Sequence, residues 1–494
     1  MLLKTLLSKI GTIEVEGPQD CDVTSITYDS RHVKPGGLFV ALRGEKVDGH
    51  QYILQAFEKG AVAVVVEESS HKSRSGTVVI VQDTRKALAD LATAYFQNPS
   101  HALKMAGITG TKGKTTVAFL LKHICERMFL QCGLIGTVRY EIAGRILPAA
   151  RTTPQSLDAQ DLLYQMRSAG CKAAVMEVSS HALMQERVRG VEFDVGVFTN
   201  LKQDHLDYHV TMENYFEAKS RMFSNLVAQT KKRGKAVINI DDQYGLRLAD
   251  KFTKQLPVIT YGVNTRADFR ASGFKTDQSG TTFQLDALEK SFLVRLPLMG
   301  RFNIYNALAA LAASTAMGLD LRTAVLSLAN APAVPGRLER VEAKRQFQVF
   351  VDYAHTEDSL LNVMKTLREL SPNRLIVVFG CGGNRDKAKR PLMGAAVEHN
   401  ADFAIITSDN PRKEQPEAII EDIKKGFHGG QYEVIVDRKD AIFKAISLAQ
   451  SRDIVLIAGK GHETYQEFAD HTIPFDDVAI AKAAIESNPL NYQT

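Results

Sequence analysis

Short runs of β-branched and other apolar residues alternate along the chain with longer stretches in which apolar residues recur every three or four positions. The short runs predict buried strands and the longer stretches predict helices. Such alternation is typical of α/β domains with mostly parallel sheets. The predicted strands are residues 61–66, 78–82, 173–178, 191–198, 236–240, 347–353, 374–379, 403–407 and 454–458. The predicted helices include residues 86–96, 117–124, 306–314 and 321–328.

Two stretches rich in proline or glycine interrupt this pattern. Asn98-Pro99-Ser100 follows one helical stretch, and residues 331–336, Ala-Pro-Ala-Val-Pro-Gly, follow two others. Proline and glycine break regular structure at such places. A chain of 494 residues is also long enough for roughly three domains. The predicted domains are residues 1–98, 99–335 and 336–494.

The composition is that of an average globular protein, with 45% apolar and 24% charged residues. It argues against disorder, collagen and coiled coil. The net charge of +5 is too small to indicate a nucleic-acid or membrane partner. The five cysteines lack CxxC spacing and fit reduced thiols in the cytosol.

The N-terminus places Leu3, Leu6 and Leu7 at helical spacing, which predicts an amphipathic helix. Lys4 and Lys9 interrupt the apolar stretch that a signal peptide requires. No run approaches the ~18 apolar residues of a transmembrane helix. We therefore expect a soluble, cytoplasmic protein.

The sharpest local signal is residues 107–116, Gly-Ile-Thr-Gly-Thr-Lys-Gly-Lys-Thr-Thr, between an apolar strand and a predicted helix. A glycine-rich loop that leads into a helix N-terminus presents N–H groups to phosphate oxygens. Lys114 can reach the β- and γ-phosphates, and the Thr115 hydroxyl can bind Mg²⁺. The spacing departs from GxxxxGK[ST], because Ile108 stands where the first glycine belongs and Gly107 precedes it. The alternative to a nucleotide site is an ordinary glycine-rich turn.

Carboxylates and histidines follow two later strands. Glu177 ends the predicted strand 173–178, which is where ligands bind in open α/β sheets, and carboxylate oxygen suits Mg²⁺. Two Asp and two His lie within residues 204–209. Zinc is one hypothesis for this segment, but HExxH and nearby cysteines are absent, so we favour Mg²⁺ near a nucleotide.

Residues 380–386, Gly-Cys-Gly-Gly-Asn-Arg-Asp, follow the predicted strand 374–379 and resemble a dinucleotide-binding loop. Arg385 stands where the last glycine of that fingerprint belongs, and Lys387, Lys389 and Arg390 come next. Cations at this place favour a loop for an anionic substrate over an NAD site.

Taken together, these strings resemble the Mur ligase family over the whole chain. These are ATP-dependent ligases that build the stem peptide of bacterial cell-wall precursors. The residues that carry the resemblance are 28–31, 35–44, 48–50, 110–116, 177–181, 199–209, 218–219, 300–306, 335–339, 351–356, 409–412 and 459–463. Two positions depart from the family pattern: Lys112, where Asn is usual, and Glu357, where Pro is usual.

The resemblance implies an α/β fold of three domains: an N-terminal uridine-nucleotide domain, a central P-loop ATPase-like parallel-sheet domain and a C-terminal Rossmann-like domain. It also implies a reaction. ATP phosphorylates the terminal carboxylate of UDP-MurNAc-L-Ala-D-Glu, the amine of an incoming amino acid attacks the acyl phosphate, and phosphate leaves. Such chemistry depends on neutralising charge around the phosphoryl group.

The family's catalytic residues map onto Lys114, Glu177, His205 and Lys219. Two Mg²⁺ ions are implied, held by Thr115 and Glu177 and by His205 and Lys219. In similar ligases the matching lysine carries a carbamate derived from CO₂ (N6-carboxylysine), which requires a neutral amine. The implied ATP-binding residues are Gly110, Thr111, Lys112, Gly113, Lys114, Thr115, Thr116, Asn303, Arg337 and Asp352.

The resemblance assigns the UDP-MurNAc-dipeptide to two groups of residues. The uridine end falls to Tyr28, Ser30, Glu45, Lys46 and Val47. The muramoyl-dipeptide falls to Thr152, Thr153, Ser179, Gln185 and Arg187.

Within the family, Asp409-Asn410-Pro411-Arg412 points to the member that adds the third residue of the stem peptide. The Arg412 guanidinium suits the distal carboxylate of meso-diaminopimelate and repels the ammonium of L-lysine. Glu463 is the candidate partner for the distal ammonium. The implied diaminopimelate-binding residues are Arg385, Asp409, Asn410, Pro411, Arg412, Gly459 and Glu463.

Several alternatives stay open from the sequence. The same step could use L-lysine, or the chain could be another Mur or folylpolyglutamate-type ligase, although the block at 28–50 favours a uridine-nucleotide domain. A nucleotide-regulated binding protein without catalysis is a further alternative. We expect a monomer that acts on small molecules.

Overall fold

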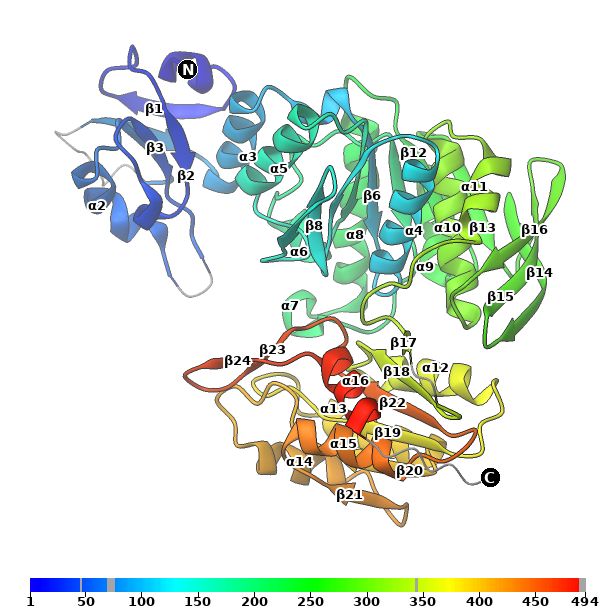
Figure 1. Ribbon diagram of the computed structural model, residues 1–494. Helices are drawn as coiled ribbons and strands as arrows, with labels where there is room; N and C mark the ends of the chain where they lie inside the picture. The colour runs from blue at the N-terminus through cyan, green and yellow to red at the C-terminus, as the bar shows by residue number, and fades with distance from the viewer. Residues whose placement is uncertain (45–46, 69–75, 343–344, 488–494) are drawn as a thin grey trace. The chain divides into compact units, whose positions relative to one another are not determined.

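The computed structural model describes residues 1–44, 47–68, 76–342 and 345–487 (Figure 1). The chain splits into two compact units. Unit 1 comprises Met1–Arg270, Ala287–Glu289 and Leu308–Ala324. Unit 2 comprises Ala271–Asp286, Lys290–Ala307 and Val325–Thr494. Among the described residues, no helix is both long and apolar enough to cross a membrane.

Unit 1 begins with a five-stranded sheet of order β1-β5-β4-β3-β2, in which β1 is antiparallel to β5 and the other pairs are parallel. Leu3, Leu6 and Leu7 of the first helix are buried, which confirms the amphipathic N-terminus. The elements are α1 (Leu3–Leu7), β1 (Thr12–Glu16), β2 (Ser25–Thr27), β3 (Gly37–Val40), α2 (Ile53–Glu58), β4 (Ala63–Val66), β5 (Thr77–Val81) and α3 (Thr84–Tyr95).

The second sheet of unit 1 has the parallel strands β13-β12-β11-β6-β10-β7, followed by antiparallel β8 and β9. Every residue of β10 and β11 is buried. Its strands are β6 (Lys104–Thr109), β7 (Cys132–Ile135), β8 (Arg139–Ile142), β9 (Arg145–Pro148), β10 (Ala173–Glu177), β11 (Val195–Phe198), β12 (Lys235–Asn239) and β13 (Val258–Gly262). Its helices are α4 (Lys114–Arg127), α5 (Ser156–Ser168), α6 (Ser180–Met184), α7 (Leu206–His209), α8 (Met212–Ala228) and α9 (Gln243–Phe252).

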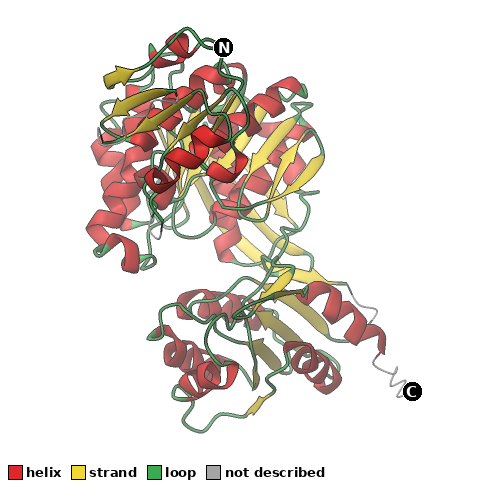
Figure 2. Ribbon diagram, turned by 90° about the vertical axis from the view of Figure 1, so that its left-hand side faces the viewer, coloured by secondary structure: helices red, strands yellow, loops and turns green. Residues whose placement is uncertain are grey.

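Unit 2 contains a six-stranded sheet of order β17-β18-β22-β19-β20-β21, parallel except for β17. Helices cover both faces (Figure 2): α12, α13 and α14 pack on one, α15 and α16 on the other. The strands are β17 (Glu339–Val341), β18 (Gln348–Asp352), β19 (Leu375–Phe379), β20 (Phe403–Ile406), β21 (Tyr432–Val434) and β22 (Ile454–Ala458), with a separate hairpin of β23 (Tyr465–Glu467) and β24 (Thr472–Pro474). The helices are α12 (Glu357–Arg368), α13 (Lys389–Asn400), α14 (Pro416–Lys424), α15 (Arg438–Leu448) and α16 (Asp477–Ser487).

The remaining elements are β14 (Phe269–Asp277), β15 (Gly280–Ala287), β16 (Lys290–Leu296), α10 (Arg301–Ala316) and α11 (Leu321–Leu328). The Thr356 side chain caps α12 together with Ser359. Glu357, which departs from the family pattern, stands in the first turn of that helix, where a carboxylate stabilises the helix dipole.

All nine predicted strands are confirmed, as β4, β5, β10, β11, β12, β18, β19, β20 and β22. The predicted strand 191–198 is too long, because β11 begins only at Val195. The predicted glycine-rich segment also begins too early. Gly107 and Ile108 belong to β6, where a Cβ on Gly107 would collide with the side chains of Met222 and Phe193.

Candidate functional site

The phosphate loop of unit 1 joins the end of β6 to the first turn of α4. Gly110 has φ +146° and Gly113 has φ +88°, conformations that favour glycine. A Cβ on Gly110 would collide with the Thr199 hydroxyl. The loop therefore has the close backbone approach that a phosphate cradle requires.

Residues after β11 hold this loop from the side. The Thr199 hydroxyl donates to the carbonyl oxygen of Lys112 at 2.7 Å, and the Lys112 N–H donates to Asn200 Oδ1 at 3.0 Å. The Thr111 N–H donates to the carbonyl of Asn200 at 2.9 Å. Lys112, the departure from the family pattern, lies 3.9 Å from a carboxylate oxygen of Asp204. These contacts fix the loop in advance of ligand binding.

Two lysines meet at the carbonyl oxygens of the loop. Lys114 Nζ donates to Gly110 and Thr111, both at 3.0 Å, and Lys219 Nζ donates to Gly110 at 2.9 Å. Lys219 is 1% exposed and lies 4.5 Å from the centre of the Tyr215 ring. Burial and then the charge of Lys114 hold the pKa of Lys219 well below its usual range.

Glu177, fully buried at the end of β10, accepts hydrogen bonds from the first turn of α4 and from the turn that follows β7. The Thr115 hydroxyl donates to Oε2 at 3.0 Å, the Thr137 hydroxyl donates to the same oxygen at 3.0 Å, and the Thr137 N–H donates to Oε1 at 2.9 Å. A carboxylate beside hydroxyls is a donor set that fits Mg²⁺. The sequence analysis missed Thr137. The feature that could have identified Thr137 is its position directly after Gly136, just beyond the end of β7, which pairs with β10.

The segment at 204–209 forms an aromatic cluster. His205 has φ +54° and packs edge-on to His181, with 5.1 Å between ring centres. Burial lowers the pKa of His205 and favours the neutral ring that can bind a metal. His209 Nε2 lies 2.9 Å from Ser180 Oγ. In the described part of the chain, no three or more His, Cys, Asp and Glu side chains gather as a metal cluster.

The residues assigned to the muramoyl-dipeptide form one hydrogen-bonded group beside Glu177. The Thr153 hydroxyl donates to the carbonyl of Glu177 at 2.7 Å and accepts from the Ser179 N–H at 3.1 Å. Arg187 donates to the carbonyl of Thr153 at 3.0 Å and to Gln185 Oε1 at 2.6 Å.

Arg187 is 7% exposed, and burial together with the charges of Arg151 and Arg85 lowers its pKa to about 10. The Thr152 hydroxyl lies 3.0 Å from that of Thr137 and so joins the group to the Glu177 carboxylate. The structure thus brings all five assigned residues together.

The residues assigned to the uridine end have separate partners. The Tyr28 hydroxyl donates to Asp158 Oδ2 at 2.6 Å, and burial raises the pKa of Tyr28. Ser30 donates to Gln55 Oε1 at 2.8 Å. Val47 is 52% exposed, whereas Glu45 and Lys46 lie outside the described residues.

In unit 2, loops at the carboxyl ends of β20 and β22 meet. Asn410 Nδ2 donates to Glu463 Oε2 at 2.8 Å, and the buried Lys460 Nζ donates to Asn410 Oδ1 at 2.9 Å. Burial raises the pKa of Glu463, and the charge of Lys460 opposes this shift. A Cβ on Gly459 would lie 2.5 Å from Asp409 Oδ2, so the loop after β22 packs closely against the Asp409 side chain of the other loop.

Arg412 lies against the loop that follows β19. Its Nε donates to Glu467 Oε2 at 2.8 Å, and its Nη1 donates to the carbonyl oxygen of Gly383 at 2.9 Å. A Cβ on Gly382 would lie 3.0 Å from Arg412 Nη1 and 3.9 Å from Arg385 Cγ, so both arginines flank this glycine. Pro411, the residue before Arg412, is buried.

The nucleotide residues assigned beyond the phosphate loop belong to unit 2. Asn303 Nδ2 donates to the carbonyl of Met299 at 2.8 Å. The Arg337 guanidinium stacks over the Tyr353 ring at 4.8 Å, and Asp352 Oδ2 accepts from the Leu338 N–H at 2.6 Å. Contacts within the unit therefore hold all three side chains.

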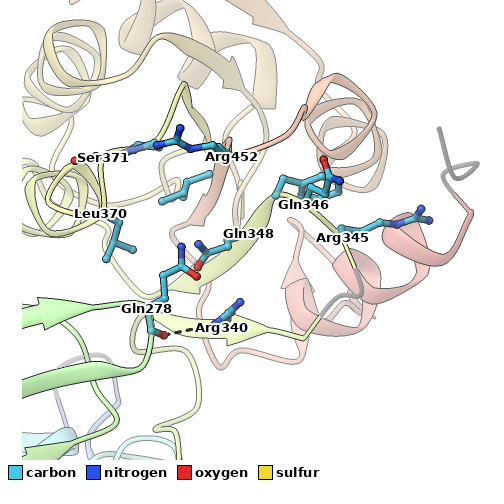
Figure 3. A pocket seen from close by; sticks show the side chains of 11 residues that line it. Gln278, Arg340, Arg345, Gln346, Gln348, Leu370, Ser371 and Arg452 are labelled. Atoms are coloured by element: carbon cyan, nitrogen blue, oxygen red, sulfur yellow. Dashed lines mark hydrogen bonds between the residues drawn. The ribbon is translucent and has the colours of Figure 1, made fainter. Parts of the chain in front are cut away.

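A separate cavity of about 170 Å³ lies at the amino ends of β18 and β22, away from the strand ends that carry these loops (Figure 3). Gln278 and Arg340 lie at one side of it and Arg452 at the other. None of the residues assigned from the sequence lines this cavity.

Comparison with known proteins identifies the family. Three family models match: "Mur ligase family, catalytic domain" over residues 22–96, "Mur ligase middle domain" over 108–314 and "Mur ligase, glutamate ligase domain" over 336–461. The UDP-N-acetylmuramoyl-L-alanyl-D-glutamate--2,6-diaminopimelate ligase of Geobacillus thermodenitrificans is 46% identical over 98% of this chain and 99% of its own. That of Halalkalibacterium halodurans is 47% identical over 94% and 95%.

A solved structure with the same name has a TM-score of 0.71 and 35% identity, covering 98% of this chain and 99% of that one. The likeness extends through all three domains, as the sequence predicted. The chain belongs to the Mur ligase family.

Proposed function

We propose that this Mur ligase joins meso-2,6-diaminopimelate to UDP-N-acetylmuramoyl-L-alanyl-D-glutamate with hydrolysis of ATP to ADP. Relatives at 46% and 47% identity carry this activity in their names. The observation in this chain that carries the choice of amino acid is that Asn410, two residues before Arg412 in the same loop, donates to Glu463 at 2.8 Å, so a cation and an anion lie on loops that touch. The reaction forms a peptide bond in peptidoglycan precursor synthesis.

The phosphate loop binds ATP in this proposal. N–H groups of residues 110–116 and the Lys114 ammonium surround the phosphates, and Lys114 exchanges its carbonyl partners for phosphate oxygens. Thr115 and Glu177 would hold one Mg²⁺, and His205 and carbamylated Lys219 a second. When bound, Mg²⁺ neutralises phosphate charge during phosphoryl transfer. Asn303, Arg337 and Asp352 contribute the remaining contacts to ATP.

Carbamylation of Lys219 is supported by its surroundings. The amine is buried and its pKa is depressed, so it is available in the neutral form that adds to CO₂ with release of a proton. The product is an anion. It places a negative charge next to Lys114 and so permits a metal ion there.

The muramoyl-dipeptide lies along the Thr153 group. Arg187 faces the substrate carboxylates with a side chain already fixed by Thr153 and Gln185. Thr152 and Ser179 add hydroxyl donors beside Glu177. Tyr28 and Ser30, with residues 45–47, bind the uridine end.

The amino-acid site supplies opposite charges to the two ends of a zwitterion. Arg412, with Arg385, binds the distal carboxylate, while Glu463 and Asp409 bind ammonium. Asn410, Pro411 and Gly459 shape the loops. The attacking amine must be neutral, and it displaces phosphate from the acyl phosphate.

We also propose domain boundaries near residues 98 and 335, a monomeric state and a cytoplasmic location. The three family matches fall inside the three proposed domains, which supports those boundaries.

Phosphate release measured with and without UDP-MurNAc-L-Ala-D-Glu, over a panel of amino acids, tests the function. We expect release that requires both the dipeptide substrate and meso-diaminopimelate. Comparable release with L-lysine would refute the choice of amino acid. Nucleotide binding without release under any condition would instead favour a nucleotide-regulated binding protein.

A further inference from the structure

We propose that Glu467 is a positioning residue that fixes the Arg412 guanidinium and thereby sets the preference for an amino acid with a distal carboxylate. The inference rests on the proposed function and assigns specificity to a residue outside the loops that were expected to bind the amino acid. Glu467 ends β23, a short strand that follows the loop at 459–463.

Glu467 is tied to the loop at 409–412 through both its side chain and its backbone. Its carboxylate accepts from Arg412 Nε at 2.8 Å, and its carbonyl accepts from the Arg412 N–H at 3.0 Å. Its own N–H donates to Asn410 Oδ1 at 3.0 Å. A lone ion pair at a partly exposed position would contribute little to stability. Here two hydrogen bonds of the Glu467 backbone also hold this residue against the loop that carries Arg412.

The backbone of Arg412 needs such support. Its φ is +53°, in the left-handed region that non-glycine residues seldom adopt. A residue in this conformation is held by the contacts around it. The bond from the Arg412 N–H to Glu467, and the bridge between Arg412 and Phe468, supply that restraint.

These contacts determine which face of the guanidinium meets a ligand. Nε is bonded to Glu467 and Nη1 to Gly383, so the planar group cannot turn about its own axis without losing one of them. Among the described residues, none hydrogen-bonds to Nη2. The Arg412 guanidinium therefore presents a fixed edge to a carboxylate. Because the side chain is already ordered, binding costs little conformational entropy.

The neighbouring glutamate has different partners. Glu463 bonds to Asn410 at 2.8 Å and pairs with Lys460 at 3.3 Å. Because the two carboxylates engage different cations, a change at Glu467 leaves the contacts of Glu463 in place. Glu467 thus acts on the carboxylate end of the substrate and not on its ammonium end.

The test uses three variants of the full-length enzyme: Glu467→Ala, Glu467→Gln and a matched control, Glu421→Ala, which removes an exposed glutamate paired with Lys424. We expect Glu467→Ala to raise the KM for meso-diaminopimelate roughly tenfold, with kcat and the KM for ATP unchanged. Gln keeps an oxygen that accepts from Nε, so Glu467→Gln should stay within about threefold of the unmodified enzyme. The control should match the unmodified enzyme.

A double-mutant cycle shows whether Glu467 acts through Arg412. On an Arg412→Ala background, Glu467→Ala should add less than about twofold to the KM. An unchanged KM in Glu467→Ala, or additive effects in the cycle, would overturn the inference. So would an equal loss of kcat and of both KM values, which marks a merely structural role. If the unmodified enzyme does not use meso-diaminopimelate at all, the proposed function is wrong. That outcome is distinguishable from failure of this inference, in which the unmodified enzyme is active and Glu467→Ala has the same KM.

Discussion

The phosphate loop of unit 1 and the amino-acid loops of unit 2 are built in different ways. In the phosphate loop, Lys114 bonds to the carbonyls of Gly110 and Thr111, a few positions away in the same chain segment. In the amino-acid loops, Arg412 and Asn410 bond to Glu467 and Glu463, which lie 55 and 53 positions further along the chain.

The difference fits the ligand that we propose for each region. A phosphate is met by backbone N–H groups and an excess of cations. One short segment can supply the N–H groups and the first cation, Lys114. A zwitterionic amino acid requires fixed charges of both signs at a set separation, and these come from separate loops. We therefore expect substitutions in the first region to abolish the chemistry, and those in the second to change which amino acid is used.

The largest effect is expected at Lys219. Lys219→Ala removes both the buried amine and its proposed carbamate, and should lower ligation at least about 10³-fold. Added short carboxylates such as acetate or formate should restore part of the activity. Lys251→Ala, at an exposed lysine paired with Glu217, is the control. Full activity of Lys219→Ala would show that the lysine has no part in the reaction.

A second change tests the same region through the phosphates. Lys114→Ala removes one charge-assisted contact to the transferring phosphoryl group and should lower kcat about 10²–10³-fold. The preference for meso-diaminopimelate over L-lysine should persist in the residual activity. Near-native ligation would mean that the nucleotide binds elsewhere.

Arg412→Ala tests the second region. Loss of a bidentate partner should weaken the binding of meso-diaminopimelate by about 2–5 kcal/mol. The ratio of kcat/KM values for meso-diaminopimelate and L-lysine measures this loss, with the KM for ATP as the internal control. If the ratio is unchanged, selection does not depend on this guanidinium. If the KM for ATP rises equally, the two regions are not separable.

The smallest effect concerns pH and the stability of unit 2. Burial, and then the charge of Arg337, lowers the pKa of His462 to about 4, and the ring also packs against Tyr353 beside Glu463. In the unfolded chain His462 binds a proton near pH 6.5, whereas in the folded chain it stays neutral down to about pH 4. The free energy of unfolding therefore falls as the pH drops from about 6.5 to about 4. After allowance for partial exposure of the ring, the loss is roughly 2 kcal/mol.

His462→Gln should remove that part of the pH dependence, as measured by urea unfolding between about pH 7 and pH 4. His399→Gln, at an exposed position on α13, is the control. An identical pH dependence in His462→Gln and the unmodified chain would contradict the assignment.

Local signals were sufficient for nine strands with apolar runs and for the phosphate loop, because there the pattern and the chemistry lie in one segment. They missed the short strands β3 and β7, although every residue of both is buried. They failed for β14 and β16, in which buried and exposed residues are mixed and no continuous apolar run exists. Tyr215 was missed beside Lys219, although the two lie four positions apart on one helix. Glu467 had no local signal at all, since its role depends on contact with a distant arginine.

The order of strands in the sheet of unit 2 has a consequence for synthesis on the ribosome. β22 lies between β18 and β19, yet it leaves the ribosome long after both of them. Until it emerges, β18 and β19 lack the strand that joins them. The buried ion pair of Arg438 and Asp477 also cannot form before residue 477 has been synthesised. Elongation proceeds at about 5–20 residues per second, so the nascent unit stays open for several seconds. The sheet of unit 2 therefore closes only after β22 has emerged, and a chain released before that point would be exposed to proteolysis.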